Sequence, residues 1–233
     1  MKKMNVLGVT LLASTVLMGA GEVFASEPSV PEPAQAKTPI SAELSINETP
    51  VQPTPPGGSE GGSDNDTGIN SLFGIAYAPG ALTGQGQLND SGESLISLTN
   101  NTNTTNKHNV GVQDKTRAQD RNWTLTAQLE WTGDDLGYMT GSSIITTGGA
   151  LTENDGAGTL TPLTTDEVVL SSGADSLEIS SVPANVIEAV EGQTVNGVYN
   201  YQFQNPQLKI PTSEAVAAGT YTGNIVWNLS EVL

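Results

Sequence analysis

The sequence contains no cysteine, and its 233 residues include one histidine, three tryptophans and three phenylalanines. A chain without cysteine has no disulfide framework, so its stability has to come from buried apolar surface. A single imidazole also leaves no paired histidine ligands for a metal ion. Since aromatic residues make up only 5% of the chain, each tryptophan is expected to contribute a large share of that burial.

Basic residues are also few: 8 Lys and Arg stand against 25 Asp and Glu, a formal net charge of −17. Lys2 and Lys3 precede an apolar run over residues 6–20, and Val23-Phe24-Ala25 offers small residues for cleavage. This pattern predicts a secretory signal peptide over residues 1–25. Its removal takes away two basic residues and one acidic residue, which makes the charge −18. So acidic a surface repels nucleic acid and anionic lipids, and neither nucleic acid nor direct membrane insertion is expected.

Proline is concentrated near the N-terminus. Residues 26–66 hold eight of the 13 prolines and end in a run of Gly, Ser and acidic residues. Too few apolar residues are present to offset the entropy of ordering, so this stretch is predicted to be a disordered linker. The remaining residues 67–233 are long enough to fold as one domain.

Two stretches alternate strictly between apolar and polar residues. Over residues 122–131 the apolar positions are Trp123, Leu125, Ala127, Leu129 and Trp131, and over residues 221–229 they include Ile225, Trp227 and Leu229. Such alternation predicts strands with one buried and one solvated face. Other short apolar runs begin near residues 72, 95, 110, 143, 168, 177, 198 and 208, and Gly, Asn, Asp and Pro separate them. We therefore predict an all-β fold, a single antiparallel β-sandwich or barrel-like domain of Greek-key or Ig-like kind.

Groups suited to catalysis are scarce. His108 stands beside the polar run of residues 100–106 and is interpreted as a solvated surface residue. Asp134 with Asp135, and Asp166 with Glu167, are acidic pairs suited to glycan cleavage, but adjacent acids between strands are more often turn formers. Residues 64–75 begin like a calcium loop yet lack its glycine and its final glutamate. We predict a non-enzymatic protein without catalytic residues, cofactor or metal, with glycan cleavage as the weakest alternative.

Each of the two alternating stretches carries a Trp-x-Leu motif, Trp123 with Leu125 and Trp227 with Leu229. Val112-x-Asp114-x-x-Arg117 precedes the first motif. Two such motifs in this order, behind a signal peptide, resemble the WxL domain of Gram-positive surface proteins, and specifically the small WxL class. The resemblance covers roughly residues 67–233.

This resemblance implies a secreted protein on the cell surface of a Gram-positive bacterium, held non-covalently on the cell wall by peptidoglycan association. It also implies co-assembly with a membrane-anchored WxL-interacting protein and with larger surface proteins. Peptidoglycan is one candidate for the immediate ligand. The alternative is that the chain is a subunit of a surface adhesion complex held by its WxL-interacting partner.

The roles of the motif residues allow two interpretations. In one, Trp123, Leu125, Trp227 and Leu229 are core residues of paired strands. In the other, one or both tryptophans lie on an exposed platform that stacks on sugar rings or on an apolar patch of a partner. Trp131 lies near the end of its strand, where exposure is easier. Asp114 and Arg117 are expected to form a partly buried salt bridge.

Overall fold

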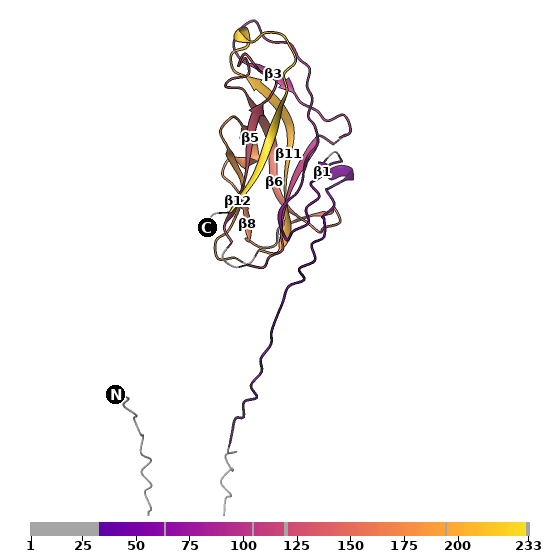
Figure 1. Ribbon diagram of the computed structural model, residues 1–233, viewed down its shortest axis with the longest axis vertical. Helices are drawn as coiled ribbons and strands as arrows, with labels where there is room; N and C mark the ends of the chain where they lie inside the picture. Colours follow the sequence, from indigo (N-terminus) through magenta and orange to yellow (C-terminus); the bar gives the residue numbers. More distant parts are fainter. Residues whose placement is uncertain (1–32, 63, 104, 119–120, 194, 232–233) are drawn as a thin grey trace, which may run out of the picture. The chain divides into compact units, whose positions relative to one another are not determined.

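The computed structural model describes residues 33–62, 64–103, 105–118, 121–193 and 195–231 (Figure 1). It divides the chain into two compact units, Met1–Leu44 and Ser45–Leu233. In the first unit, the described residues 33–44 contain no helix or strand, and all of them are exposed. The predicted signal peptide lies outside the described residues. Within the described part of the chain, no helix has both the length and the apolar character needed to cross a membrane.

Two antiparallel sheets form the second unit. The larger, eight-stranded sheet has the order β1-β2-β4-β11-β6-β7, with β3 paired to β11 and β9 paired to β6. Its strands are β1 (Asp64–Asp66), β2 (Phe73–Pro79), β3 (Ser94–Ser97), β4 (Lys107–Asp114), β6 (Ser143–Asn154), β7 (Leu160–Pro162), β9 (Glu178–Ile179) and β11 (Gly197–Ile210).

The smaller, four-stranded sheet has the order β12-β5-β10-β8. Its strands are β5 (Trp123–Trp131), β8 (Val168–Leu170), β10 (Ala184–Ala189) and β12 (Gly223–Glu231). In the described residues, the 3-10 helix η1 (Gly58–Glu60) precedes β1, and the 3-10 helices η2 (Ala174–Ser176) and η3 (Ser213–Ala215) lie between strands. This arrangement confirms the predicted all-β antiparallel fold.

The core lies between the inner faces of the two sheets. Alternation along β5 directs its apolar residues inward, and they meet the inward residues of β4 and β11. Trp123 is fully buried there, with its ring centroid 6.2 Å from that of Phe73 and 6.1 Å from that of Tyr199. On β11 the aromatic run continues with Tyr201 and Phe203, which are also fully buried. A few large rings thus fill much of the core, among mainly aliphatic neighbours.

A segment over residues 50–66, the N-terminal strap, packs on the outer face of the large sheet. Its last residues form β1, which pairs with β2. Upstream, the backbone N–H of Thr54 donates to the carbonyl of Gly156 at 3.0 Å, and the Gln52 side chain donates to the carbonyl of Ala76 at 2.9 Å. The disorder expected through residue 66 therefore does not describe this segment. Hydrogen bonds to the sheet and the burial of Pro53 and Pro56 order it, and composition alone does not reveal these contacts.

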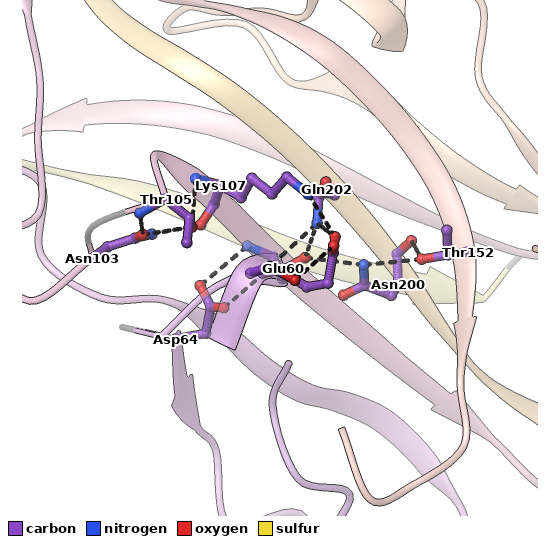
Figure 2. A network of polar contacts seen from close by, with 10 residues as sticks. Glu60, Asp64, Asn103, Thr105, Lys107, Thr152, Asn200 and Gln202 are labelled. Carbon is purple, nitrogen blue, oxygen red and sulfur yellow. Dashed lines mark hydrogen bonds and ion pairs between the residues drawn. The ribbon is translucent and has the colours of Figure 1, made fainter. Parts of the chain in front are cut away.

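The strap meets a row of amide side chains on β4 and β11 (Figure 2). The backbone carbonyl of Glu60 accepts from Asn109 at 2.7 Å and from Gln202 at 3.2 Å. The Asp64 carboxylate accepts from the backbone N–H of Asn109 at 3.1 Å and from its side chain at 2.9 Å. Burial raises the pKa of Asp64 to about 6. At the rim, Lys107 Nζ lies 2.8 Å from the Glu60 carboxylate.

His108 is buried, which corrects the solvated position expected from the sequence. The imidazole is 1% exposed and its centroid lies 5.3 Å from that of Phe203. Because β4 already begins at Lys107, His108 takes the inward-facing position two residues before Val110. Neither ring nitrogen has a hydrogen-bond partner among the described residues. Burial lowers the pKa of His108.

Replacing His108 with phenylalanine is expected to stabilise the protein, because it removes two unsatisfied buried nitrogens. The gain in unfolding free energy at pH 7 should be about 1–2 kcal/mol. When the pKa of a histidine is lower in the folded state than in the unfolded chain, the fold loses stability as the pH falls below the ordinary histidine pKa of about 6.5. The advantage of His108→Phe should therefore be larger at pH 5. Urea titrations at both pH values would measure it, and a variant less stable than wild type at both would contradict the expectation.

Candidate functional site

The two Trp-x-Leu motifs lie on adjacent strands and face the same interior. In the β5–β12 pair, Trp227 stands opposite Ala127 and Leu229 opposite Leu125. Trp123 and Leu125 are fully buried, whereas Trp227 and Leu229 are half-buried because β12 ends the sheet. Trp227 still packs inward, with its ring centroid 6.1 Å from that of Phe203. Both motifs are therefore part of the packing between the sheets.

Asp114 is the partner of the first motif tryptophan. Its Oδ2 atom accepts a hydrogen bond from Trp123 Nε1 at 3.0 Å, and both residues are fully buried. Its Oδ1 atom accepts from the backbone N–H and the hydroxyl of Thr116, at 3.0 and 2.6 Å. The polar edge of the indole is thus satisfied inside the core, which is the usual requirement for a buried tryptophan.

The salt bridge expected between Asp114 and Arg117 is not formed. Both Asp114 oxygens are occupied by Trp123 and Thr116, and Arg117 is exposed on the turn beyond β4. Arg117 has a φ of 55°, in the left-handed region. The Asp-x-x-Arg spacing therefore reflects two separate roles: the aspartate anchors a core tryptophan, and the arginine faces outward.

Trp131, at the far end of β5, lines a surface cavity of about 530 Å³. The half-buried indole donates from Nε1 to the Ser142 hydroxyl at 3.0 Å, and that hydroxyl donates to the carbonyl of Met139. The polar residues that line the cavity with Trp131 are Gln128, Glu130, Asp134, Thr140, Ser142 and Ser181. An aromatic ring held beside hydroxyl, amide and carboxylate groups is suited to binding polar ligands with an apolar face.

Asp134 shapes the wall of this cavity through the backbone. Its two carboxylate oxygens accept from the N–H groups of Tyr138 and Met139, both at 2.8 Å. Asp134 therefore holds the β5–β6 loop, while its neighbour Asp135 is exposed. In the other acidic pair, Glu167 accepts a hydrogen bond from the Tyr199 hydroxyl. These contacts give Asp134 and Glu167 structural roles.

Sequence reasoning singled out Trp131 but missed the residues that complete its cavity. Ser142 and Met139 belong to a loop with no motif, and they reach the ring only because β5 and β6 are joined across that loop. The one available signal was the strand-end position of Trp131. The other two tryptophans, at the interior of the sandwich, are held away from this surface.

The fold and these sites define an all-β domain in which the tryptophans of two adjacent strands pack between the sheets and a polar cavity opens at the surface. Residues 31–232 match the family described as WxL domain, surface cell wall-binding, so the chain belongs to that family. The family resemblance of the two motifs is thereby confirmed, and membership places the chain among surface domains that bind the cell wall. Comparisons with curated proteins and with solved structures find no match.

Proposed function

We propose that the chain is a non-enzymatic protein exported by a Gram-positive bacterium and held non-covalently on the cell wall by direct contact between its WxL domain and peptidoglycan. The Trp131 cavity is the observation that carries this proposal. Its volume of about 530 Å³ is in the range of small-ligand sites. The family to which the chain belongs is described as binding the cell wall, which is the surface that contains peptidoglycan.

The chemistry of the cavity suits the glycan part of peptidoglycan. A sugar ring offers an apolar C–H face that can pack on an indole, while its hydroxyl groups hydrogen-bond to the surrounding side chains. Gln128 and Thr140 supply an amide and a hydroxyl beside Trp131. With a net charge of −17, the protein gains nothing from long-range attraction to an anionic wall. Binding should therefore depend on short-range contacts and resist added salt.

The test is a pull-down of the purified protein with isolated sacculi at low and high salt, beside the variant Trp131→Ala. Wild-type protein should bind at both salt concentrations, and the variant should bind roughly tenfold more weakly because it loses an aromatic contact worth about 1–1.5 kcal/mol. Circular dichroism would establish that the variant is folded. Equal binding by a folded Trp131→Ala variant, or loss of wild-type binding in salt, would contradict the proposal.

A matched pair of glutamines provides the control. Gln128 lines the cavity, whereas Gln193 is exposed on the β10–β11 loop. Gln128→Ala should weaken sacculus binding and Gln193→Ala should leave it unchanged, although both remove the same side chain. Equal effects of the two changes would place the contact elsewhere on the surface.

A second candidate function is that of a subunit held by a membrane-anchored WxL-interacting protein. It is favoured by β12, which pairs with β5 along one edge and with no other described strand. The other edge of this nine-residue strand therefore offers unpaired backbone groups to an added strand from a partner. Co-elution of the two purified proteins at micromolar concentration, with no sacculus binding by this chain alone, would favour this function over the first.

A further inference from the structure

A second cavity, of about 190 Å³, lies at the opposite end of the domain from Trp131. Lys115 and Arg117 line it just beyond β4, whose last residue, Asp114, contacts Trp123 at the start of β5. The nine residues of β5 thus separate the two cavities by a strand length of roughly 30 Å. The walls of the small cavity combine apolar and amide groups from Ile46, Asn47, Pro50, Val51, Leu72 and Asn196.

The two cations in this cavity differ from the other cations of the domain. Residues 45–233 contain five Lys and Arg residues. Lys107, Arg121 and Lys209 each pair with a glutamate, at distances between 2.8 and 3.5 Å. Neither Lys115 nor Arg117 pairs with any described carboxylate. In so acidic a protein, two cations that share one cavity and pair with no described carboxylate make a local positive site.

The backbone at Arg117 gives a second and independent indication of a site. Its φ of 55° is unfavourable for a residue with a Cβ atom by roughly 1 kcal/mol. Such conformations persist where the surrounding structure imposes them, and they are frequent at ligand sites. Here the N–H of Arg117 donates to the carbonyl of Val195 at 3.1 Å, which ties the turn to the segment before β11. The turn holds Arg117 on the same cavity as Lys115.

We propose that this cavity binds the terminal carboxylate of a short peptide of the cell wall, an inference that rests on the proposed peptidoglycan contact. A carboxylate can accept hydrogen bonds from both a guanidinium and an ammonium group. The volume suits the end of a chain rather than a whole glycan, and the wall formed by Ile46, Val51 and Leu72 suits a small apolar residue such as alanine.

The net charge of the protein favours a single carboxylate over a polyanion as the ligand of this cavity. At −17, the molecule repels a long phosphate polymer over its whole surface. A single carboxylate at the end of a peptide meets only the local field of Lys115 and Arg117, which acts at short range. The site therefore favours one terminal carboxylate over an extended anionic chain.

The experiment titrates the purified protein with acetyl-D-alanyl-D-alanine, with the same peptide carrying a C-terminal amide, and with inorganic phosphate, followed by NMR. The acid should bind at least tenfold more tightly than the amide, because the amide loses one charge-assisted hydrogen bond. Equal binding of acid and amide, or no binding of the acid at about 10 mM, would overturn the inference. Phosphate binding as tight as that of the acid would overturn its specificity for a carboxylate.

Three single variants locate the site. Lys115→Gln and Arg117→Asn should each weaken binding of the acid roughly tenfold. Asparagine is chosen at residue 117 because it tolerates the left-handed conformation, so the backbone is preserved. Lys37→Gln removes a charge from an exposed residue of the first unit and should change nothing. An acid affinity unaltered by both cavity variants would overturn the assignment.

Sacculus binding, measured on the same preparations, separates this inference from the proposed function. If wild-type protein binds sacculi but not the acid, the carboxylate site is wrong and the peptidoglycan contact stands. If it binds the acid but not sacculi, the site is supported and the proposed function is wrong. Weaker binding of both ligands by Arg117→Asn would support the two together.

Discussion

Replacing Trp123 with alanine is expected to abolish most of the stability of the domain. A buried tryptophan replaced by alanine costs about 3–5 kcal/mol through lost burial and the cavity left behind. The change also leaves the fully buried Asp114 oxygen without its indole donor, which adds about 1–3 kcal/mol. The sum is comparable to the whole unfolding free energy of a typical domain, about 5–15 kcal/mol. Urea unfolding followed by near-ultraviolet circular dichroism would measure it.

A conservative variant separates the two contributions. Trp123→Phe keeps an aromatic ring beside Phe73 and Tyr199 but removes the donor to Asp114. It should therefore cost less than Trp123→Ala while still destabilising the fold by about 1–3 kcal/mol. Wild-type stability in Trp123→Phe would show that the Asp114 contact contributes nothing, and wild-type stability in Trp123→Ala would contradict the core position of this residue.

Deleting residues 26–66 is the second change with a large expected effect. The deletion removes the strap and its hydrogen bonds to Ala76, Asn109, Gly156 and Gln202. At about 0.5–1.5 kcal/mol for each of these four hydrogen bonds, the loss should be on the order of 2–6 kcal/mol. Deleting residues 26–44 is the matched control, because this shorter truncation leaves Ser45–Leu233 intact. Equal urea midpoints for the two truncations would show that a self-contained domain begins at residue 67.

The contact between Asp64 and Asn109 is tested by comparing the stabilities of the two truncated proteins at different pH values. The pKa of Asp64 is about 6 in the folded protein, against an ordinary value of 3.8, so the folded state holds this proton more tightly than the unfolded chain. The contribution of Asp64 to stability is therefore greatest below pH 3.8 and is lost as the pH rises through about 6. The advantage of the strap-containing chain should be larger at pH 5 than at pH 7, by about 1 kcal/mol. Both truncated proteins contain His108, so its pH-dependent contribution to stability cancels in the comparison.

Alternation made the two motif strands predictable. Residues 123–131 and 223–231 form strands whose apolar positions face inward, as the sequence indicates. Around Asn205 and Pro206 the sequence prediction was wrong. Proline was expected to separate two strands that begin near residues 198 and 208. The structure forms one strand, β11, with register shifts on either side of Gln204 and a φ of 49° at Asn205. A bulge accommodates the proline there without ending the strand.

The features that sequence did not predict all depend on pairing between distant segments. The strap is held by amide groups of Asn109 and Gln202, which a local reading assigns to a solvated strand face. Asp114 has charge partners nearby in sequence, yet its hydrogen bond to Trp123 requires the chain to turn between β4 and β5. His108 became buried because its strand starts earlier than its polar neighbours suggest. Composition and the alternation of apolar residues describe a segment by itself, but not the surface against which it packs.

The position of the strap also determines how the domain would respond to mechanical force. When the domain is fixed to a wall and the chain is pulled from residues 33–44, the load enters at the strap before it reaches the sandwich. The strap's polar contacts with Ala76, Asn109 and Gly156 would then rupture first, releasing a length of slack chain. β5, which carries Trp131 at the proposed wall contact, is anchored in the core by the fully buried Trp123 and would yield only after the strap. The strap would thus act as a sacrificial extension that absorbs work while the wall-binding fold stays intact.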